Sequence, residues 1–229
     1  MLPITAITKF SLQDFPDHTS CIIWFGGCNF RCPYCHNPEF IHKGFPIMEE
    51  KEVFDFLETR AGKLDGVTLS GGECTLTDEL PDFIKRVKAM GFKVKIDTNG
   101  SNYQKVRDLV NEDLIDFIAL DIKAPEHKFK LISKSDRYED FNKTLNLLAE
   151  NKIPSEVRTT VHTDLIQEDD INQIIQDLDN RGYMGNYYVQ NYRDDNDKTL
   201  ENLGKQKRVL DKEKLIKPKG FKLDFRNFW

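Results

Sequence analysis

The sequence predicts an α/β protein folded as an open or partial barrel of six β–α units. Two observations lead to this fold class. Short β-rich runs alternate with helical patterns along most of the chain, and such alternation implies parallel strands joined by right-handed crossovers. The chain of 229 residues has room for six such units, but not for the eight of a complete barrel. A doubly wound open sheet is the alternative arrangement of the same elements.

The strand candidates carry Ile, Val, Phe, Trp, Tyr and Thr, and turn residues bound most of them. In chain order they are Thr19–Phe25, Gly66–Ser70, Lys93–Thr98, Phe117–Ile122, Ser155–Val161 and Tyr187–Asn191. The helical candidates between them place apolar residues at positions i, i+3 and i+4. They are Glu49–Arg60, Pro81–Met90, Tyr103–Glu112, Tyr138–Asn151 and Gln167–Arg181. For the second helix, Thr77-Asp78 is the predicted N-cap region and Gly91 fits the position after the C-cap.

The composition predicts a folded domain. Hydrophobic residues make up 39% and charged residues 31%, which excludes a disordered or fibrous chain. The length favours one domain over residues 1–229, with a core over about residues 15–192 and a charged extension over 193–229.

The apolar pattern, the first segment and the net charge of the chain argue against a membrane and against nucleic acid as partners. The longest apolar run, Cys21–Phe25, is far shorter than the ~20 residues that a membrane helix needs. No basic segment followed by an apolar stretch begins the chain, so we expect a cytoplasmic protein that does not contact membranes. The net charge of −5 argues against general nucleic-acid binding.

The extension differs in pattern from the rest of the chain. Arg193–Lys198 and Lys205–Lys219 are dense in charge and have no clear periodicity. They predict a solvated loop and a peripheral helix, with a docking surface as the alternative. The closing apolar residues are too many for a free tail, so we expect them to pack on the body of the protein; they are Phe221, Leu223, Phe225, Phe228 and Trp229.

Three of the five cysteines lie within eight residues, in the spacing Cys28-x3-Cys32-x2-Cys35. An odd number of cysteines in a chain with no export signal argues against a disulfide framework and favours a metal site. A structural zinc ion needs four ligands, so His36 or His42 would have to complete the set. A four-iron cluster takes one ligand for each iron, so three cysteines leave one iron open to a small molecule. We favour the cluster.

In this loop the sequence resembles the radical S-adenosylmethionine (SAM) superfamily. The motif of that family is Cys-x3-Cys-x2-Cys with an aromatic residue before the last cysteine, here Tyr34. The resemblance implies a single [4Fe–4S] cluster on Cys28, Cys32 and Cys35, with SAM bound at the open iron. It also implies reductive cleavage of SAM to a 5′-deoxyadenosyl radical, a partial (βα)6 barrel, and a place for Tyr34 near the adenine.

A glycine pair ends the second predicted strand, in Gly71-Gly72-Glu73. Such a pair lets another molecule approach the backbone closely. The segment resembles the family's Gly-Gly-Glu motif, which implies contact with the amino group of SAM. The next residue, Cys74, stands where the family often has proline, and neither it nor Cys21 is assigned as a cluster ligand.

Acidic residues end the next two predicted strands, in Asp97-Thr98-Asn99-Gly100 and Asp121-Ile122-Lys123. Turn-making and helix capping would account for them without a ligand. The resemblance to glycyl-radical activases implies that these segments surround SAM and a monovalent cation. On that basis Asp97, Thr98 and Asp121 are cation candidates. Asn99, Lys123 and Arg158 are SAM candidates, and Arg158 is placed near the SAM carboxylate; its alternative is an ordinary salt bridge.

Over its length the chain is most similar to activating proteins of anaerobic ribonucleoside-triphosphate reductase. The segments that support this similarity are Lys95–Ser101, Ala119–Pro125 and Arg158–His162. Tyr34–Pro38 resembles the activating enzymes of glycyl radical enzymes as a group, and Leu12–Asp17 looks like a variant of another of their segments. The implied partners are a glycyl radical enzyme and a flavodoxin- or ferredoxin-type electron donor. One alternative is a radical SAM enzyme with another protein, peptide, nucleotide-precursor or RNA target, such as a pyruvate formate-lyase-type activase. A zinc-binding module is the other.

Overall fold

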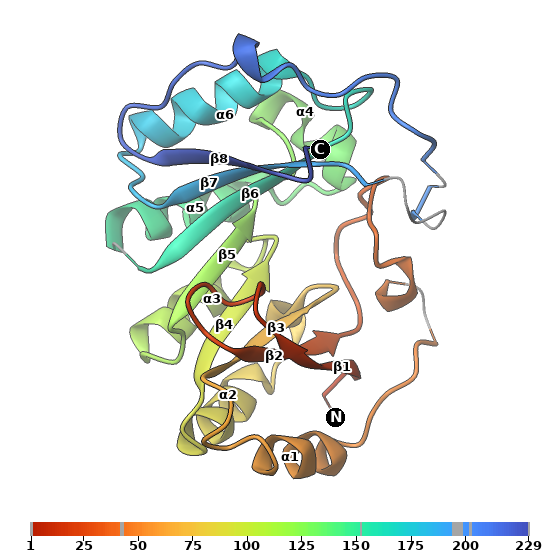
Figure 1. The fold of residues 1–229 in the computed structure, drawn as a ribbon, viewed down its shortest axis with the longest axis vertical. Helices are drawn as coiled ribbons and strands as arrows, with labels where there is room; N and C mark the ends of the chain where they lie inside the picture. The colour runs from red at the N-terminus through yellow and green to blue at the C-terminus, as the bar shows by residue number, and fades with distance from the viewer. Residues whose placement is uncertain (1, 42–43, 152, 194–198, 202, 229) are drawn as a thin grey trace. The chain divides into compact units, whose positions relative to one another are not determined.

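The computed structural model describes residues 2–41, 44–151, 153–193, 199–201 and 203–228. Within them, eight strands occur in the sheet order β1-β2-β3-β4-β5-β6-β7-β8 (Figure 1). The strands are β1 Ile4–Ser11, β2 Ser20–Phe25, β3 Gly66–Gly71, β4 Lys93–Thr98, β5 Phe117–Asp121, β6 Ser155–Val161, β7 Asn186–Asn191 and β8 Lys222–Arg226. A doubly wound sheet reverses its strand order at a switch point. This order never reverses, which agrees with the barrel-type arrangement and not with the doubly wound alternative.

Six α-helices connect or flank these strands in the described residues. They are α1 Glu50–Glu58, α2 Leu80–Ala89, α3 Tyr103–Asn111, α4 Glu126–Ser133, α5 Tyr138–Asn151 and α6 Glu168–Asn180. Five were predicted, with ends that differ by at most two residues. Helix α2 begins after Glu79 rather than at Thr77-Asp78, whereas Gly91 has the left-handed φ of +89° expected after a helix end. None of these helices is both long and apolar enough to cross a membrane.

The chain divides into two compact units. The first comprises Met1–Asn29, Glu39–Thr98 and Asn102–Ala119. In it β2, β3 and β4 are parallel, and their central residues Ile23, Leu69 and Ile96 are fully buried. The sequence did not predict β1, which pairs antiparallel with β2 and has Lys9 and Phe10 exposed near its end.

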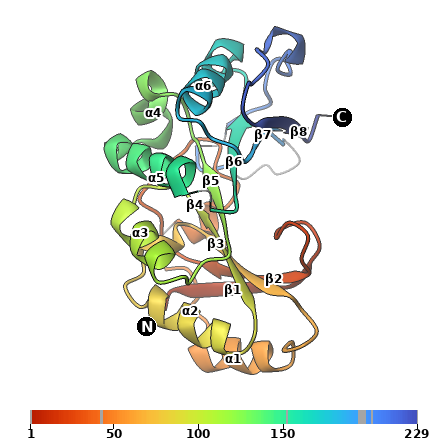
Figure 2. The same cartoon turned by 90° about the vertical axis from the view of Figure 1, so that its left-hand side faces the viewer.

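The second unit comprises Phe30–Pro38, Asn99–Ser101 and Leu120–Trp229. Strands β6, β7 and β8 are parallel, and helices α4, α5 and α6 lie on one side of them (Figure 2). Val157, Tyr187 and Val189 are buried in this sheet. Because side chains alternate along a strand, the neighbouring Glu156, Arg158 and Tyr188 belong to its other face. The interpretation of the whole chain as one domain stays a prediction.

The extension forms no α-helix over residues 205–219, so the predicted peripheral helix is wrong. Its regular structure there is a single 3-10 turn at Lys212–Lys214. Side chains of α6 hold its backbone instead. Asn172 accepts a hydrogen bond from Ile216 N at 2.9 Å and donates one to Lys214 O at 3.0 Å, while Asp179 accepts one from Lys219 N at 2.9 Å. Backbone bound in this way is not available for helical hydrogen bonds.

The apolar end of the chain packs as expected, through a strand that the sequence did not predict. β8 pairs parallel with β7, with Leu223 beside Tyr187 and Phe225 beside Val189. The Phe221 ring lies 6.2 Å from that of Tyr187. Residues 194–198 and Trp229 lie outside the described residues.

Candidate active site

The first cysteine of the triplet follows β2 in a loop whose backbone packs tightly on the glycine pair. Gly72 N donates to Phe25 O at 2.8 Å, and Glu73 N donates to Gly27 O at 2.8 Å. A Cβ atom on Gly72 would lie 1.9 Å from Gly27 O, which no side chain could tolerate. The glycine pair was predicted to admit a close approach, and the approaching group in this structure is the chain's own loop before Cys28.

Glu73 directs its carboxylate into the first unit and is 2% exposed. Its Oε1 accepts hydrogen bonds from Thr75 Oγ1 at 2.5 Å, Thr98 Oγ1 at 2.8 Å and Thr75 N at 3.2 Å. The hydroxyl of Thr98, a predicted cation ligand, is therefore a donor to Glu73. These neutral donors compensate the burial of the charge.

The other candidate of β4, Asp97, forms an ion pair with Lys95 and accepts a hydrogen bond from Ser70 Oγ at 2.9 Å. The Lys95 side chain is 1% exposed, so a buried ammonium already balances this carboxylate. A monovalent cation at Asp97, Thr98 and Asp121 stays a prediction.

Cys21 and Cys74 are fully buried in the first unit. Burial raises the pKa of Cys21 to about 12 and that of Cys74 well above its ordinary value. The thiol of Cys74 lies 3.7 Å from Asp97 O and 3.9 Å from Leu69 O, among backbone groups. Thiols that stay protonated do not bind metals well, which agrees with leaving both residues unassigned.

The rest of the cysteine loop belongs to the second unit. Cys32 is buried, Cys35 is half-buried, and Cys35 N donates to Cys32 O at 3.0 Å. Phe30 packs edge-on against Phe129 of α4, with ring centroids 5.6 Å apart. These contacts fix the loop against α4 before the second cysteine.

Tyr34 is 4% exposed, and its hydroxyl donates to Lys123 O at 3.2 Å. Burial, reinforced by the neighbouring Cys32, raises its pKa well above the ordinary value, so the hydroxyl keeps its proton. The loop is thereby tied to the segment that follows β5.

A line of alternating charges runs across the second unit, and we call it the charge row. Arg158 Nε lies 2.8 Å from Asp121 Oδ1, and Lys123 Nζ lies 3.0 Å from Asp121 Oδ2. Arg158 NH1 is also 3.6 Å from Glu156, which in turn lies 3.0 Å from Arg226 NH2. The charge row is Lys123, Asp121, Arg158, Glu156 and Arg226.

Two predicted SAM candidates, Lys123 and Arg158, therefore meet at a predicted cation ligand, Asp121. Burial alone would raise the pKa of Asp121, but Arg158 and Lys123 outweigh it and hold that pKa well below its usual range. Burial would lower the pKa of Lys123, yet the Asp121 charge keeps it above its ordinary value. All three groups are charged near neutral pH.

Glu156 and Arg226 were not identified from the sequence. Glu156 shares a strand face with Arg158, two residues away, and this alternation was a usable signal. Arg226 gave no such signal, because β8 was not recognised as a strand and its partner is 70 residues distant.

Asn99 and His36 have structural contacts. Asn99 is 5% exposed, and its Oδ1 accepts a hydrogen bond from Ser101 N at 2.9 Å, as expected for a turn-making residue. The ring of His36 stacks on Tyr192 with centroids 5.1 Å apart. His42, the other candidate for a zinc site, lies outside the described residues.

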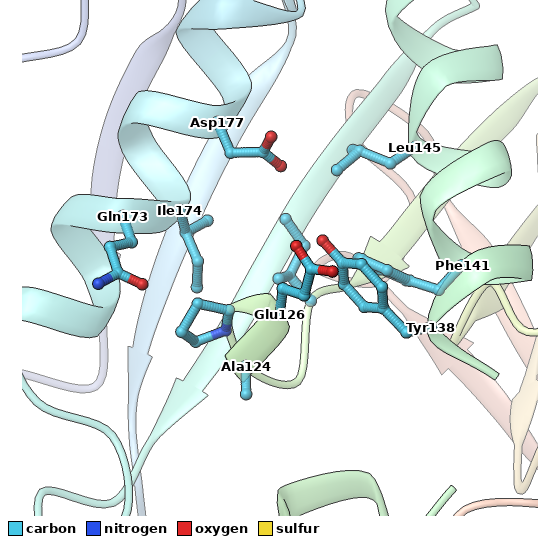
Figure 3. A pocket seen from close by; sticks show the side chains of 10 residues that line it. Ala124, Glu126, Tyr138, Phe141, Leu145, Gln173, Ile174 and Asp177 are labelled. Carbon is cyan, nitrogen blue, oxygen red and sulfur yellow. The ribbon is translucent and has the colours of Figure 1, made fainter. Parts of the chain in front are cut away.

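A cavity of about 180 Å³ lies in the second unit, between α4, α5 and α6 (Figure 3). Figure 3 shows Glu126, Tyr138 and Asp177 around an apolar floor. Burial, with the Glu126 charge, raises the pKa of Tyr138 to about 12. None of the predicted site residues lines this cavity.

The loop cysteines have the donor chemistry that an iron–sulfur cluster needs. None of the five cysteines is given a disulfide partner in the structure, so the three thiols of the loop remain candidates for cluster ligands. Among the residues that the structure describes, no three His, Cys, Asp or Glu side chains gather around a position for a single ion. A four-iron cluster binds each thiolate at a separate iron, so its ligands need not meet at one point.

Comparisons with known proteins agree with the chemistry of the cysteine loop. Residues 22–179 match the family model of the radical SAM superfamily. A Methanocaldococcus jannaschii protein named as a glycyl-radical enzyme activating enzyme is 34% identical over 177 residues, which cover 75% of this chain and 73% of that protein. The pyruvate formate-lyase-activating enzyme of Clostridium pasteurianum is 32% identical over 160 residues, 62% of each chain.

A solved structure of Streptococcus suis SuiB bound to S-adenosylmethionine shares the fold, with a TM-score of 0.65 and 12% identity. It aligns with 90% of this chain and 52% of its own. The predicted fold class, an α/β radical SAM core, is confirmed. The chain is an enzyme of the radical SAM superfamily and is similar, within that superfamily, to the activating enzymes of glycyl radical enzymes.

Proposed function

We propose that the chain activates anaerobic ribonucleoside-triphosphate reductase by generating a glycyl radical on it, using SAM and one [4Fe–4S] cluster. The observation that carries the proposal is the Cys-x3-Cys-x2-Cys triplet in a chain 34% identical to a protein named as a glycyl-radical enzyme activating enzyme. The electron comes from a flavodoxin- or ferredoxin-type donor.

In this proposal Cys28, Cys32 and Cys35 hold the cluster. When bound, the reduced cluster supplies the electron that cleaves SAM. The chain's own residues position the substrate. Gly71, Gly72 and Glu73 bind its amino group, and the positive charges of Lys123 and Arg158 attract its carboxylate.

Three features of the chain support this positioning. The backbone bond between Glu73 N and Gly27 O connects the SAM segment to the loop of the first cysteine. The Tyr34 hydroxyl, bound to Lys123 O, connects the loop of the other two cysteines to the charge row. Asp121 balances part of the charge of Lys123 and Arg158, so neither cation is left uncompensated when SAM is absent.

The second candidate has the same chemistry and a different target. Relatives named as pyruvate formate-lyase-activating enzymes, from Clostridium pasteurianum at 32% identity and Escherichia coli at 36%, favour an enzyme of that kind as the partner. The two candidates differ only in the protein that receives the radical.

The chemistry is tested under anaerobic conditions. The protein is reconstituted with iron and sulfide, then given dithionite and SAM, and 5′-deoxyadenosine is measured by chromatography. Wild type should form it, Cys32→Ala should not, and Cys21→Ala should behave like wild type because Cys21 is a buried strand residue. No 5′-deoxyadenosine from protein with an intact cluster would overturn the proposal.

The target is tested by electron paramagnetic resonance. The reduced protein and SAM are mixed separately with an anaerobic ribonucleoside-triphosphate reductase and with a pyruvate formate-lyase. A glycyl doublet with the reductase supports the first candidate. A doublet with the lyase alone supports the second.

A further inference from the structure

The charge row ends on the last strand of the chain, at Arg226. Its guanidinium donates to Glu156 at 3.0 Å and 3.4 Å, and its central carbon lies 3.5 Å from the centre of the Tyr188 ring. The two contacts hold the guanidinium in one place, by charge on one side and by the aromatic face on the other. Arg226 follows the segment that matches the family model, residues 22–179.

Glu156 depends on this contact. Its side chain is 4% exposed, and among the described residues its cationic partners are Arg226 at 3.0 Å and Arg158 at 3.6 Å. A buried carboxylate that loses one partner draws more strongly on the other, because an uncompensated buried charge is costly. Without Arg226, Glu156 would therefore compete with Asp121 for Arg158.

The net charge of the charge row shows what a substitution of Arg226 would remove. Lys123, Arg158 and Arg226 are positive, and Asp121 and Glu156 are negative, so the row carries one surplus positive charge. Neutralising Arg226 makes the row neutral. An approaching carboxylate would lose both the net attraction and the placement of Arg158 beside Asp121.

We infer that Arg226 is a positioning residue for SAM: by balancing Glu156, it keeps Arg158 at Asp121, where Arg158 receives the SAM carboxylate. The inference rests on the proposed function, and it makes the last strand a part of the SAM site. Arg226 acts through Arg158 and does not touch SAM itself.

The first measurement compares two ligands on the reconstituted protein by calorimetry. S-adenosylhomocysteine carries the carboxylate, and 5′-methylthioadenosine lacks it. We expect Arg226→Met to weaken S-adenosylhomocysteine about tenfold, since a charged partner of a buried ion pair is removed, and to leave 5′-methylthioadenosine unchanged. The KM for SAM should rise with kcat within about twofold. Arg226→Lys should restore part of the affinity.

Two further variants separate positioning from simple loss of structure. The double variant Glu156→Gln with Arg226→Met removes both the cation and the carboxylate that would draw Arg158 away, so its affinity should recover toward wild type. Arg208→Met also deletes an arginine paired with a glutamate of the second unit, Glu168, at 2.6 Å. Because that pair is outside the charge row, S-adenosylhomocysteine affinity should not change.

A third measurement does not depend on SAM chemistry. The Nε–H resonance of Arg158, bonded to Asp121 at 2.8 Å, is followed by nitrogen NMR. It should exchange faster with water in Arg226→Met and recover in the double variant. If this resonance and the affinity for S-adenosylhomocysteine are unchanged in Arg226→Met, the inference is wrong. If wild type binds S-adenosylhomocysteine but cleaves no SAM, the proposed function is wrong. The affinities of the variants and the NMR measurement still show whether Arg226 positions Arg158.

Discussion

Two buried glutamates, one in each unit of this protein, are satisfied in different ways. Glu73 in the first unit is 2% exposed and is satisfied by threonine hydroxyls and a backbone N–H. Glu156 in the second is 3% exposed and is satisfied by two arginines. Hydroxyl and backbone donors require close, fixed geometry, whereas ion pairs act over longer distances. Changes of shape should therefore be most damaging around Glu73, and changes of charge around Glu156.

The largest effect is expected where shape matters most. Gly72→Ala places a Cβ atom 1.9 Å from Gly27 O, so the loop before Cys28 must move. Overpacking of this kind should lower the free energy of unfolding by about 3 kcal/mol. Urea denaturation measures it, with Gly204→Ala as control because a Cβ atom there meets nothing within 4 Å. Equal stabilities of the two variants would contradict the shape argument.

The next effect concerns charge in the second unit. Asp121→Asn leaves Lys123 and Arg158 without the carboxylate between them, at 3.0 Å and 2.8 Å. We expect a loss of about 2 kcal/mol, because a partly buried ion pair is broken. Salt screens like-charge repulsion, and the Debye length falls to about 3 Å in 1 M NaCl. Part of the loss should therefore disappear at that salt concentration. A loss that does not depend on salt would place Asp121 with the shape-sensitive residues.

A smaller change tests the hydroxyl donors of the first unit. Thr98→Val removes the donor that lies 2.8 Å from Glu73 Oε1 while keeping the shape of the side chain. The free energy of unfolding should fall by about 1 kcal/mol, the usual value of such a bond. Thr98→Ser keeps the hydroxyl and should recover most of the loss. Unlike Asp121→Asn, the valine variant should be equally destabilised at low and high salt.

The smallest effect is expected at an ion pair outside the charge row. Hydrogen bonds from Arg208 lower the pKa of Glu168 to about 2 from an ordinary 4.5, against the opposing effect of burial. A carboxylate with a lowered pKa in the folded state stabilises the fold above pH 4.5 and loses that contribution as the pH falls toward 2. Unfolding measured across this range should depend less on pH in Glu168→Gln than in wild type. An unchanged pH dependence would show that the half-exposed Arg208 contributes nothing measurable.

The central strands could be predicted from the sequence because their signal is local. The predicted bounds of Lys93–Thr98 and Ser155–Val161 coincide with β4 and β6. Both are short runs rich in β-branched residues, and buried parallel strands require such runs. The strands at the two ends of the order, β1 and β8, were missed because each pairs on one side only and carries exposed charges.

The candidate site divides in the same way. Sequence motifs identified Cys28, Cys32, Cys35 and the glycine pair as candidates, because their signal is a fixed spacing along the chain. Spacing could not show that Gly72 packs on Gly27, or that Arg226 reaches Glu156 across 70 residues. Contacts of this kind depend on which strands become neighbours, and one chain in isolation does not encode that in any local pattern.

The attachment of the extension to α6 bears on how this protein can diverge. Asn172 and Asp179 bind backbone groups of Ile216 and Lys219, and no side chain of the extension takes part in these bonds. Substitutions along that part of the extension therefore leave these bonds intact, whereas a change at either helix residue removes its bond to the extension. Over evolutionary time the extension is free to vary in sequence while keeping its path, so related chains can carry different surfaces there on the same support.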